Sequence, residues 1–240
     1  MANTLPRVPV GTILRTLEDL YPDAHCELDH RNPYELLIAT ILSAQCTDKR
    51  VNMITPELFE HYPTPGAMAK ASLEDVERLI AQCGLYKMKA KNIVETSRRI
   101  SDEHGGEVPN TMETLVALPG VGRKTANVVL SNAFGVPAIA VDTHVQRVSN
   151  RLGLADSDDV LETEQQLMRR IPKAQWTQAH HWLIFHGRRV CNARQPQCSR
   201  CELAVSCRTF RESAKRQKRK RAREQSTVRD SGKGLGDDLG

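Results

Sequence analysis

Residues 118–126 read Leu118-Pro119-Gly120-Val121-Gly122-Arg123-Lys124-Thr125-Ala126. Helical patterns precede and follow this stretch, so its Pro-Gly-Val-Gly turn is predicted to join two helices. Gly120 and Gly122 tolerate a left-handed backbone and let an anion approach backbone N–H groups. Lys124 opens the second helix, where the positive end of the helix dipole favours a neutral, nucleophilic amine. The alternative is an ordinary tight turn beside a solvated lysine.

The positive charge of the chain is concentrated at its C-terminal end. The 240 residues carry a net charge of +5. Residues 208–240 hold 11 Lys and Arg against 5 Asp and Glu, whereas the first 207 residues hold 23 against 24. The body therefore needs a local basic patch to bind a polyanion. The basic tail is either a segment that binds phosphates unspecifically or a solvated, unstructured end.

Nothing in the sequence predicts a membrane span or secretion. The chain has no apolar run of 18 residues, and the segment from Met1 to Arg7 lacks the apolar core of a signal peptide. We therefore expect a cytoplasmic monomer, long enough to bury a full hydrophobic core.

Apolar residues recur at helical spacing along most of the chain, and no clear strand pairs occur, so the sequence predicts an all-α fold. Residues 33–42 are apolar on nearly all sides, which predicts a buried helix, although a buried strand has the same pattern. Asp142, and either Thr47 or Asp48, stand where helix N-caps are expected. The other predicted helices cover residues 10–21, 49–59, 72–83, 86–104, 111–118, 124–134, 142–152, 162–170 and 175–188.

The chain has seven cysteines, and an odd number without a signal peptide argues against a disulfide framework. Three of them, Cys26, Cys46 and Cys83, are interpreted as small buried residues. The other four follow the spacing C-x6-C-x2-C-x5-C and are Cys191, Cys198, Cys201 and Cys207. Zinc sites usually contain two separated Cys-x2-Cys pairs, whereas this spacing suits the converging ligands of a cubane cluster. A 4Fe-4S cluster is the favoured interpretation, with structural zinc and free thiols as alternatives.

Three patterns coincide in this chain: the glycine turn with Lys124, the segment Val141-Asp142-Thr143-His144, and the cysteine cluster. Together they resemble the endonuclease III family of DNA repair glycosylases, within the helix-hairpin-helix superfamily. Further family-like segments are Ser43-Ala44-Gln45, Gly84-Leu85-Tyr86, Leu118 to Asn127 and His180-His181-Trp182-Leu183. The resemblance runs from about residue 10 to residue 211, so the basic tail departs from the compact end of the family.

The resemblance implies two helical domains on either side of a DNA-binding cleft. A six-helix domain of continuous sequence, residues 26–137, carries the helix-hairpin-helix motif at about residues 111–134. Residues 8–25 join residues 138–211 in the iron–sulfur cluster domain, and residues 212–240 form a basic, unstructured tail. The implied partner is double-stranded DNA that contains a damaged base or an abasic site.

The resemblance also implies a bifunctional glycosylase and abasic-site lyase that removes oxidised or ring-damaged pyrimidines. Lys124 attacks the sugar C1′, expels the base and forms a Schiff base, and β-elimination then cleaves the strand on the 3′ side of the lesion. Asp142 stabilises the charge that develops on the sugar, although an N-cap role explains it as well. Gln45 matches the residue that fills the vacated space, and Leu85 matches the wedge. The expected DNA contacts are Gln45, Leu85, Gly120, Val121, Gly122, Arg123, Thr125 and His144.

Two other hypotheses are kept. An adenine mismatch glycosylase shares the fold, hairpin and cluster, but it typically lacks a lysine where this chain has Lys124. It also carries an extra C-terminal domain, for which the roughly 30 residues after Cys207 are too few. A non-catalytic iron–sulfur DNA-binding protein is the second alternative, and it makes no demand on Lys124 or Asp142.

Overall fold

The computed structural model describes residues 8–231, and side chains as far as residue 220. Residues 1–7, the segment without a signal-peptide core, and residues 232–240, the end of the expected tail, lie outside the described residues.

Between residues 8 and 231 all regular secondary structure is helical, which confirms the predicted all-α fold. Every predicted helix is present, with ends that differ by at most four residues. The elements are α1 (Val10–Leu20), α2 (Pro33–Leu42), α3 (Asp48–His61), α4 (Pro65–Ala69), α5 (Leu73–Leu79), α6 (Tyr86–Glu103), α7 (Met112–Val116), α8 (Arg123–Ala133), α9 (Thr143–Leu152), α10 (Val160–Arg170), η1 (Lys173–Gln175), α11 (Trp176–Arg189), η2 (Cys198–Arg200) and α12 (Arg208–Ser231).

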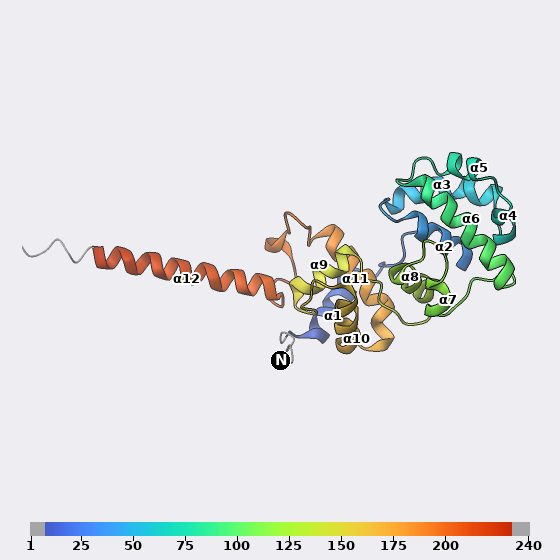
Figure 1. The fold of residues 1–240 in the computed structure, drawn as a ribbon. Coiled ribbons are helices and arrows are strands. Elements are labelled where there is room, and N and C mark those ends of the chain that lie inside the picture. Colours follow the sequence, from blue (N-terminus) through green and yellow to red (C-terminus); the bar gives the residue numbers. More distant parts are fainter. Residues whose placement is uncertain (1–7, 232–240) are drawn as a thin grey trace, which may run out of the picture.

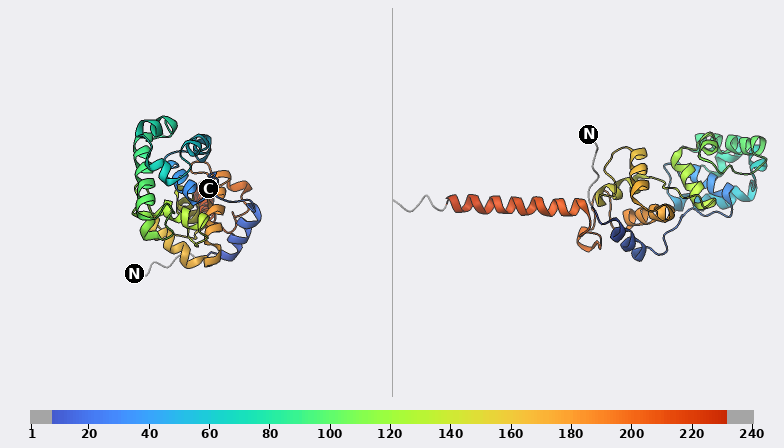
Figure 2. Two further views of the ribbon diagram at one scale, coloured as in Figure 1. Left: turned by 90° about the vertical axis from the view of Figure 1, so that its right-hand side faces the viewer. Right: turned by 90° about the horizontal axis from the view of Figure 1, so that it is seen from below.

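The helices pack around two hydrophobic cores, which form the two lobes seen in Figures 1 and 2. Helices α2 to α8 supply the first core, with Leu37 and Ile93 fully buried in it. Helices α1, α9, α10 and α11 supply the second, which contains Leu17 and Leu183. The second core therefore combines the N-terminal helix with the C-terminal half of the chain.

Helix α2 lies at the centre of the first lobe. The side chain of Asn32 accepts a hydrogen bond from Glu35 N at 2.9 Å, and Pro33 occupies the first helical position. All residues from Tyr34 to Leu42 are buried. The strand alternative for this segment is therefore wrong, and the all-round apolar pattern reflects a helix packed on every side.

A short extended segment connects the two cores. Residues 138–141 are all buried, with Ile139 and Val141 in the second core and Ala140 in the first. This alternation follows from the two-residue repeat of an extended chain, which points successive side chains to opposite sides. Asn127 Nδ2 donates to the carbonyl oxygen of Ile139 at 3.0 Å, so α8 anchors the segment that leads to α9.

Residues 26–137 contain seven helices instead of the predicted six. The extra helix is α4, where Thr64 caps the N-terminus by accepting from Ala67 N at 3.2 Å and Pro65 takes the first position. Five residues are too short to show a helical repeat of apolar positions, which explains why the pattern did not predict it. Helix α5 is also shorter than predicted, and Cys83 lies in the turns that follow it.

The tail differs from the prediction as well. Residues 208–231 form a single helix, α12, that projects away from both lobes (Figures 1 and 2), whereas an unstructured tail was expected from residue 212. Lys, Arg, Glu, Gln and Ala are good helix formers, and neither Gly nor Pro occurs between residues 208 and 231. The helix propensity of these residues therefore accounts for α12, although the segment has no apolar face that could pack against the lobes.

Candidate functional site

The glycine turn is fixed by side chains of α6. Gly120 has φ of +76°, and a Cβ at this position would lie 2.8 Å from Asn92 Nδ2. Thr96 Oγ1 donates to the carbonyl oxygen of Pro119 at 2.8 Å. Both the left-handed backbone and the close approach of Asn92 therefore require glycine at position 120.

Gly122 has a different role. Its φ is −90°, so the left-handed backbone that glycine tolerates is not used at this position. A Cβ at Gly122 would meet no atom within 4 Å, and Gly122 caps α8 without any side-chain hydrogen bond to the first turn. The first helical N–H groups, including those of Arg123 and Thr125, therefore face an open surface suited to an anion.

Val121 and Arg123, both predicted DNA contacts, are engaged within the protein. The Val121 side chain is buried, and its N–H donates to the carbonyl oxygen of Leu118 at 3.1 Å. Arg123 Nε and Nη2 donate to the buried carboxylate of Glu164 at 2.9 and 2.7 Å, and Asn127 Nδ2 donates to the same group at 3.1 Å. The Arg123 side chain thus ties α8 to α10, and DNA contact by either residue stays a prediction.

We expect Arg123→Ala to lower the free energy of unfolding by about 2 kcal/mol, because Glu164 would keep a buried carboxylate with only Asn127 as donor. Chemical denaturation of this variant, with exposed Arg15→Ala as the matched control, measures the effect. Unchanged stability combined with a weaker salt dependence of DNA binding would instead assign Arg123 to a phosphate.

Lys124 and Asp142 come together in one small pocket of about 70 Å³. Lys124 belongs to the first turn of α8, in the first lobe, and Asp142 caps α9 in the second. Asp142 Oδ1 accepts hydrogen bonds from His144 N and Val145 N, both at 2.8 Å. Ser43 lines the same pocket. A carboxylate and an amine from different cores thus share one cavity.

Two neighbouring histidines of α11 form the buried wall of this small pocket. His181 Nε2 lies 2.8 Å from Asn132 Oδ1 of α8. Burial lowers the pKa of His181 to about 4, and burial likewise holds the pKa of His180 well below its usual value. Both rings are therefore neutral near pH 7 and add no positive charge to the pocket that holds Lys124 and Asp142.

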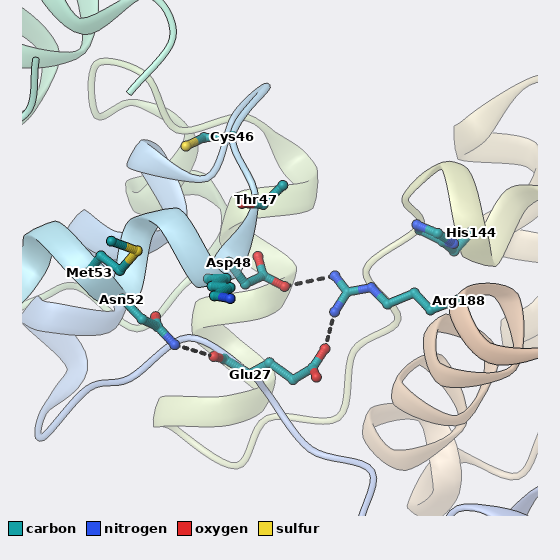
Figure 3. Close-up of a pocket in the computed structure, with 9 residues that line it drawn as sticks. Glu27, Cys46, Thr47, Asp48, Asn52, Met53, His144 and Arg188 are labelled. Carbon is teal, nitrogen blue, oxygen red and sulfur yellow. Dashed lines mark hydrogen bonds and ion pairs between the residues drawn. The ribbon is translucent and has the colours of Figure 1, made fainter. Parts of the chain in front are cut away.

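A larger cavity of about 760 Å³ adjoins the small one and shares Glu27, Asp48 and Arg188 with it (Figure 3). Arg188, near the end of α11, donates to Asp48 Oδ2 at 2.7 Å and also to Glu27. Thr47 caps α3 by accepting from Arg50 N, so Asp48 is not the cap, and its carboxylate accepts from Arg188. Asp48, Glu27 and Arg188 thus link the two lobes.

Glu27 and Arg188 were not predicted. Glu27 stands in an irregular segment, and Arg188 is one of several basic residues in the last turn of α11. No sequence spacing distinguishes them from solvated charges, because their partner residues are 161 and 140 positions away.

His144 lies on the opposite side of the larger cavity from Asp48 (Figure 3). Its Nδ1 is 3.1 Å from Arg147 Nη2. Burial lowers the pKa of His144, Asp142 opposes this shift, and the nearby Arg147 and Arg188 add to it. We therefore expect a neutral ring that can accept or donate a hydrogen bond at the edge of the cavity.

Gln45 and Leu85 are the only non-glycine residues with positive φ in the described part of the chain, at 53° and 60°. Gln45 is exposed, and 51% of Leu85 is exposed, which excludes a buried helix-end contact for Leu85. Strained backbone in exposed residues is typical of functional loops. The two loops also meet, because a Cβ at Gly84 would lie 3.4 Å from the carbonyl oxygen of Gln45.

The four clustered cysteines line a single cavity of about 160 Å³ near the start of α12. No three His, Cys, Asp or Glu side chains in residues 8–220 are close enough together to hold one metal ion. Burial raises the pKa of Cys201 and of Cys207, which favours the neutral thiol while no metal is bound. Donors spread around a cavity fit a multi-iron cluster better than a single zinc ion.

Basic and aromatic side chains support the cysteine loop. Arg151 donates to the carbonyl oxygens of Asn192 and Ala193 at 2.7 and 2.8 Å. His186 Nε2 lies 3.7 Å from Cys201 Sγ, and its Nδ1 is 2.9 Å from the hydroxyl of Tyr21 on α1. The loop is therefore held by residues of both α9 and α11.

Residues 38–173 match the family model described as the HhH-GPD superfamily of base excision DNA repair proteins. The fold and site thus define a helix-hairpin-helix protein of base excision repair. Endonuclease III of Bacillus subtilis (strain 168) is 53% identical over 207 residues, which cover 86% of this chain and 93% of that protein. Endonuclease III of Escherichia coli (strain K12) is 47% identical over 195 residues, covering 81% and 92%. The chain belongs to the endonuclease III family.

Solved structures of endonuclease III support the same family assignment. A trapped covalent intermediate of endonuclease III with DNA has a TM-score of 0.82 and 52% identity, covering 87% of this chain and 100% of that chain. A non-covalent endonuclease III–DNA complex has a TM-score of 0.81 and 53% identity, covering 86% and 97%. None of the helices described between residues 8 and 231 combines the length and apolar character that a membrane span requires.

Proposed function

We propose that this protein is a bifunctional DNA glycosylase and abasic-site lyase of base excision repair, acting in the cytoplasm on oxidised or ring-damaged pyrimidines in double-stranded DNA. Its relatives named endonuclease III, 43–53% identical, support this assignment. The observation that carries it is the pairing of Lys124 and Asp142 in one pocket between two lobes.

We infer that the two cores correspond to two domains, residues 26–137 and residues 8–25 plus 138–211. The distribution of buried residues supports this division, since only Ala140 of the C-terminal part belongs to the first core. Duplex DNA binds across the two domains. The uncapped N-terminus of α8 contacts a phosphate beside the lesion, with Gly120 and Gly122 keeping the approach clear.

A base within a duplex is inaccessible, so the enzyme must extrude the damaged nucleotide. Gln45 and Leu85 are placed on touching exposed loops, which suits their joint entry into the vacated space. The extruded sugar then reaches the pocket of Lys124 and Asp142. Glu27, Asp48 and Arg188 lie at the boundary of the pocket. They orient the DNA strand, and their ion pairs hold the two lobes in a fixed relative position.

The neutral amine of Lys124 attacks C1′ while the bond to the base breaks, and the base leaves with the electron pair and gains a proton. The Asp142 carboxylate stabilises positive charge on the sugar during this step. Loss of a proton and opening of the sugar give an iminium at C1′. Removal of a C2′ proton then expels the 3′ phosphate, and water releases Lys124 from the product.

Borohydride reduction of the iminium tests this mechanism. We expect the native protein to become covalently attached to a duplex with one abasic site, as measured by gel shift under denaturing conditions. A panel of single-lesion duplexes, including a ring-saturated pyrimidine and an adenine mismatch, separates the main hypothesis from the adenine glycosylase. Absence of trapping, or release of adenine alone, would overturn the proposal.

We propose that Cys191, Cys198, Cys201 and Cys207 hold a 4Fe-4S cluster. The cavity they line and the supporting contacts of Arg151 and His186 are compatible with it. When bound, the cluster supplies a rigid, anionic cross-link that stabilises the loop before α12.

Protein purified without oxygen should contain about four irons and four sulfides per chain and show broad visible absorption. Iron analysis, sulfide analysis and absorption spectroscopy measure this. Cys198→Ala, which removes one ligand, should lose the absorption, whereas Cys26→Ala should retain it. A colourless protein with one zinc per chain would contradict the cluster.

The basic helix α12 should add affinity for duplex DNA without taking part in the reaction. Deleting residues 212–240 is expected to weaken binding at low salt and to reduce its salt dependence, while turnover at saturating DNA is unchanged. A matched variant replaces the five basic residues at 215, 216 and 218–220 with glutamine. It removes their positive charge but keeps the helix propensity of the segment, so it separates the effect of charge from the effect of the helix. Loss of turnover at saturating DNA would show that the tail does more than bind.

A further inference from the structure

Two cysteines outside the cluster lie beside the two exposed loops. Cys46 follows Gln45 in the loop of residues 43–47, which we call the Gln45 loop. Cys83 precedes Leu85 in the turn of residues 80–85, which we call the Leu85 loop. The sulfur atoms are 3.6 Å apart, although the residues are 37 positions apart in sequence.

The surroundings hold these loops together. Arg50 Nη1 donates to Gln82 Oε1 at 2.6 Å, and the buried Lys89 Nζ donates to the carbonyl oxygen of Leu42 at 2.8 Å. The close approach of Gly84 to the Gln45 carbonyl adds a backbone contact. The sulfurs therefore meet at a packed junction, and a disulfide requires them to approach from 3.6 Å to the bonding distance of about 2.05 Å.

The two thiols differ in accessibility. Cys46 is half-buried and lines the larger cavity, whereas Cys83 is 2% exposed. Burial, followed by the contact with Cys46, raises the pKa of Cys83 to about 11, with Lys89 and Arg50 as opposing cations. An oxidant that enters the cavity meets Cys46 first, and Cys83 is the neighbouring thiol that can complete a disulfide.

We propose that Cys46 and Cys83 form a reversible disulfide that cross-links the Gln45 loop and the Leu85 loop. With hydrogen peroxide as oxidant, Cys46 becomes a sulfenic acid and one water is released. The Cys83 sulfur then attacks the Cys46 sulfur, the S–O bond breaks, and a second water leaves. Two thiols lose two electrons and peroxide is reduced to two waters. A small-molecule dithiol reverses the reaction by exchange.

The functional consequence rests on the proposed function, in which Gln45 and Leu85 enter the duplex together. Closing the sulfur–sulfur gap pulls both loops from their reduced positions. Because a displacement of about 1 Å at a positioned group can reduce activity by on the order of 10²-fold, oxidation should weaken binding to a lesion duplex at least tenfold. The disulfide thus reversibly lowers DNA engagement.

The test treats the anaerobic holoenzyme with diamide, which oxidises two thiols and is itself reduced to a hydrazine. Free thiols are then blocked, and tryptic peptides are mapped without reduction. We expect peptide 32–49 linked to peptide 79–87, while peptide 16–31, which holds Cys26, stays unlinked. Visible absorption recorded before and after treatment reports on the cluster. Absence of the linked pair overturns the proposal, and this map requires no variant to fold.

DNA binding is measured on the same samples. Affinity for a lesion duplex should fall at least tenfold on oxidation and recover with dithiothreitol, and Cys83→Ala should show neither change. Cross-linked protein with unchanged affinity would overturn the regulatory effect. Failure of the reduced protein to trap an abasic site would overturn the proposed function instead, since the peptide map does not depend on activity.

Discussion

Lys124→Ala should abolish borohydride trapping on abasic-site DNA and lower base release by on the order of 10⁴-fold or more, since removal of a nucleophile eliminates the covalent route. Lys124 is exposed and lies in the first turn of α8, where alanine is well tolerated, so the fold should persist. Single-turnover kinetics and a melting curve measure the two effects. Exposed Lys70→Ala provides a matched control that should trap like the native protein.

The same variant distinguishes the remaining hypotheses. A water-activating glycosylase would release base in the absence of the amine, and a non-catalytic DNA-binding protein would show no turnover before or after substitution. Trapping that persists in Lys124→Ala at native rates would assign the Schiff base to another amine. Binding to undamaged duplex should change little, because the helix N-terminus and the glycine turn are retained.

Substitution of Asp142 should have the second large effect on base release. Its role as a helix N-cap and its role as a negative charge can be separated by two different substitutions. Asn is as good an N-cap as Asp, so Asp142→Asn should retain the hydrogen bonds to His144 N and Val145 N. It removes the negative charge, and base release should fall by roughly 10²-fold or more. Asp142→Ala should lose both the charge and the cap, with about 1 kcal/mol lower stability as well.

Single-turnover base release and denaturant unfolding, measured on both Asp142 variants, decide between the roles. Native-like base release in Asp142→Asn, combined with instability of Asp142→Ala, would mean that Asp142 serves only as a cap. Borohydride trapping on a preformed abasic site should be less affected than base release, since that substrate has no N-glycosidic bond to break.

Much of the fold follows from local patterns. Helix positions were predictable because apolar periodicity and caps such as Asp142 and Thr47 act within a few residues along the chain. The short helix α4 and the tail helix α12 were not predicted, for two different reasons. Helix α4 has too few residues for a repeat, and α12 has high helix propensity without an apolar stripe.

The residues of the candidate site likewise fall into those that local sequence patterns predicted and those that they did not. Lys124, Asp142 and the four clustered cysteines were identifiable because their spacing lies within short segments. The ion pairs of Arg123 with Glu164 and of Arg188 with Asp48 join residues 41 and 140 positions apart, and ordinary surface arginines have the same local sequence. Such pairs are visible only once the lobes are packed.

By itself, the sequence determined the helical class, the close spacing of four cysteines and the presence of a lysine at a glycine-bounded helix start. Only the tertiary structure decided that Gly120 is required by Asn92 while Gly122 leaves an open surface. It also decided that Cys46 and Cys83 meet between the exposed loops. The physical reason is that backbone hydrogen bonds and periodicity are local, whereas steric approach, burial and ion pairing depend on residues far apart in the chain.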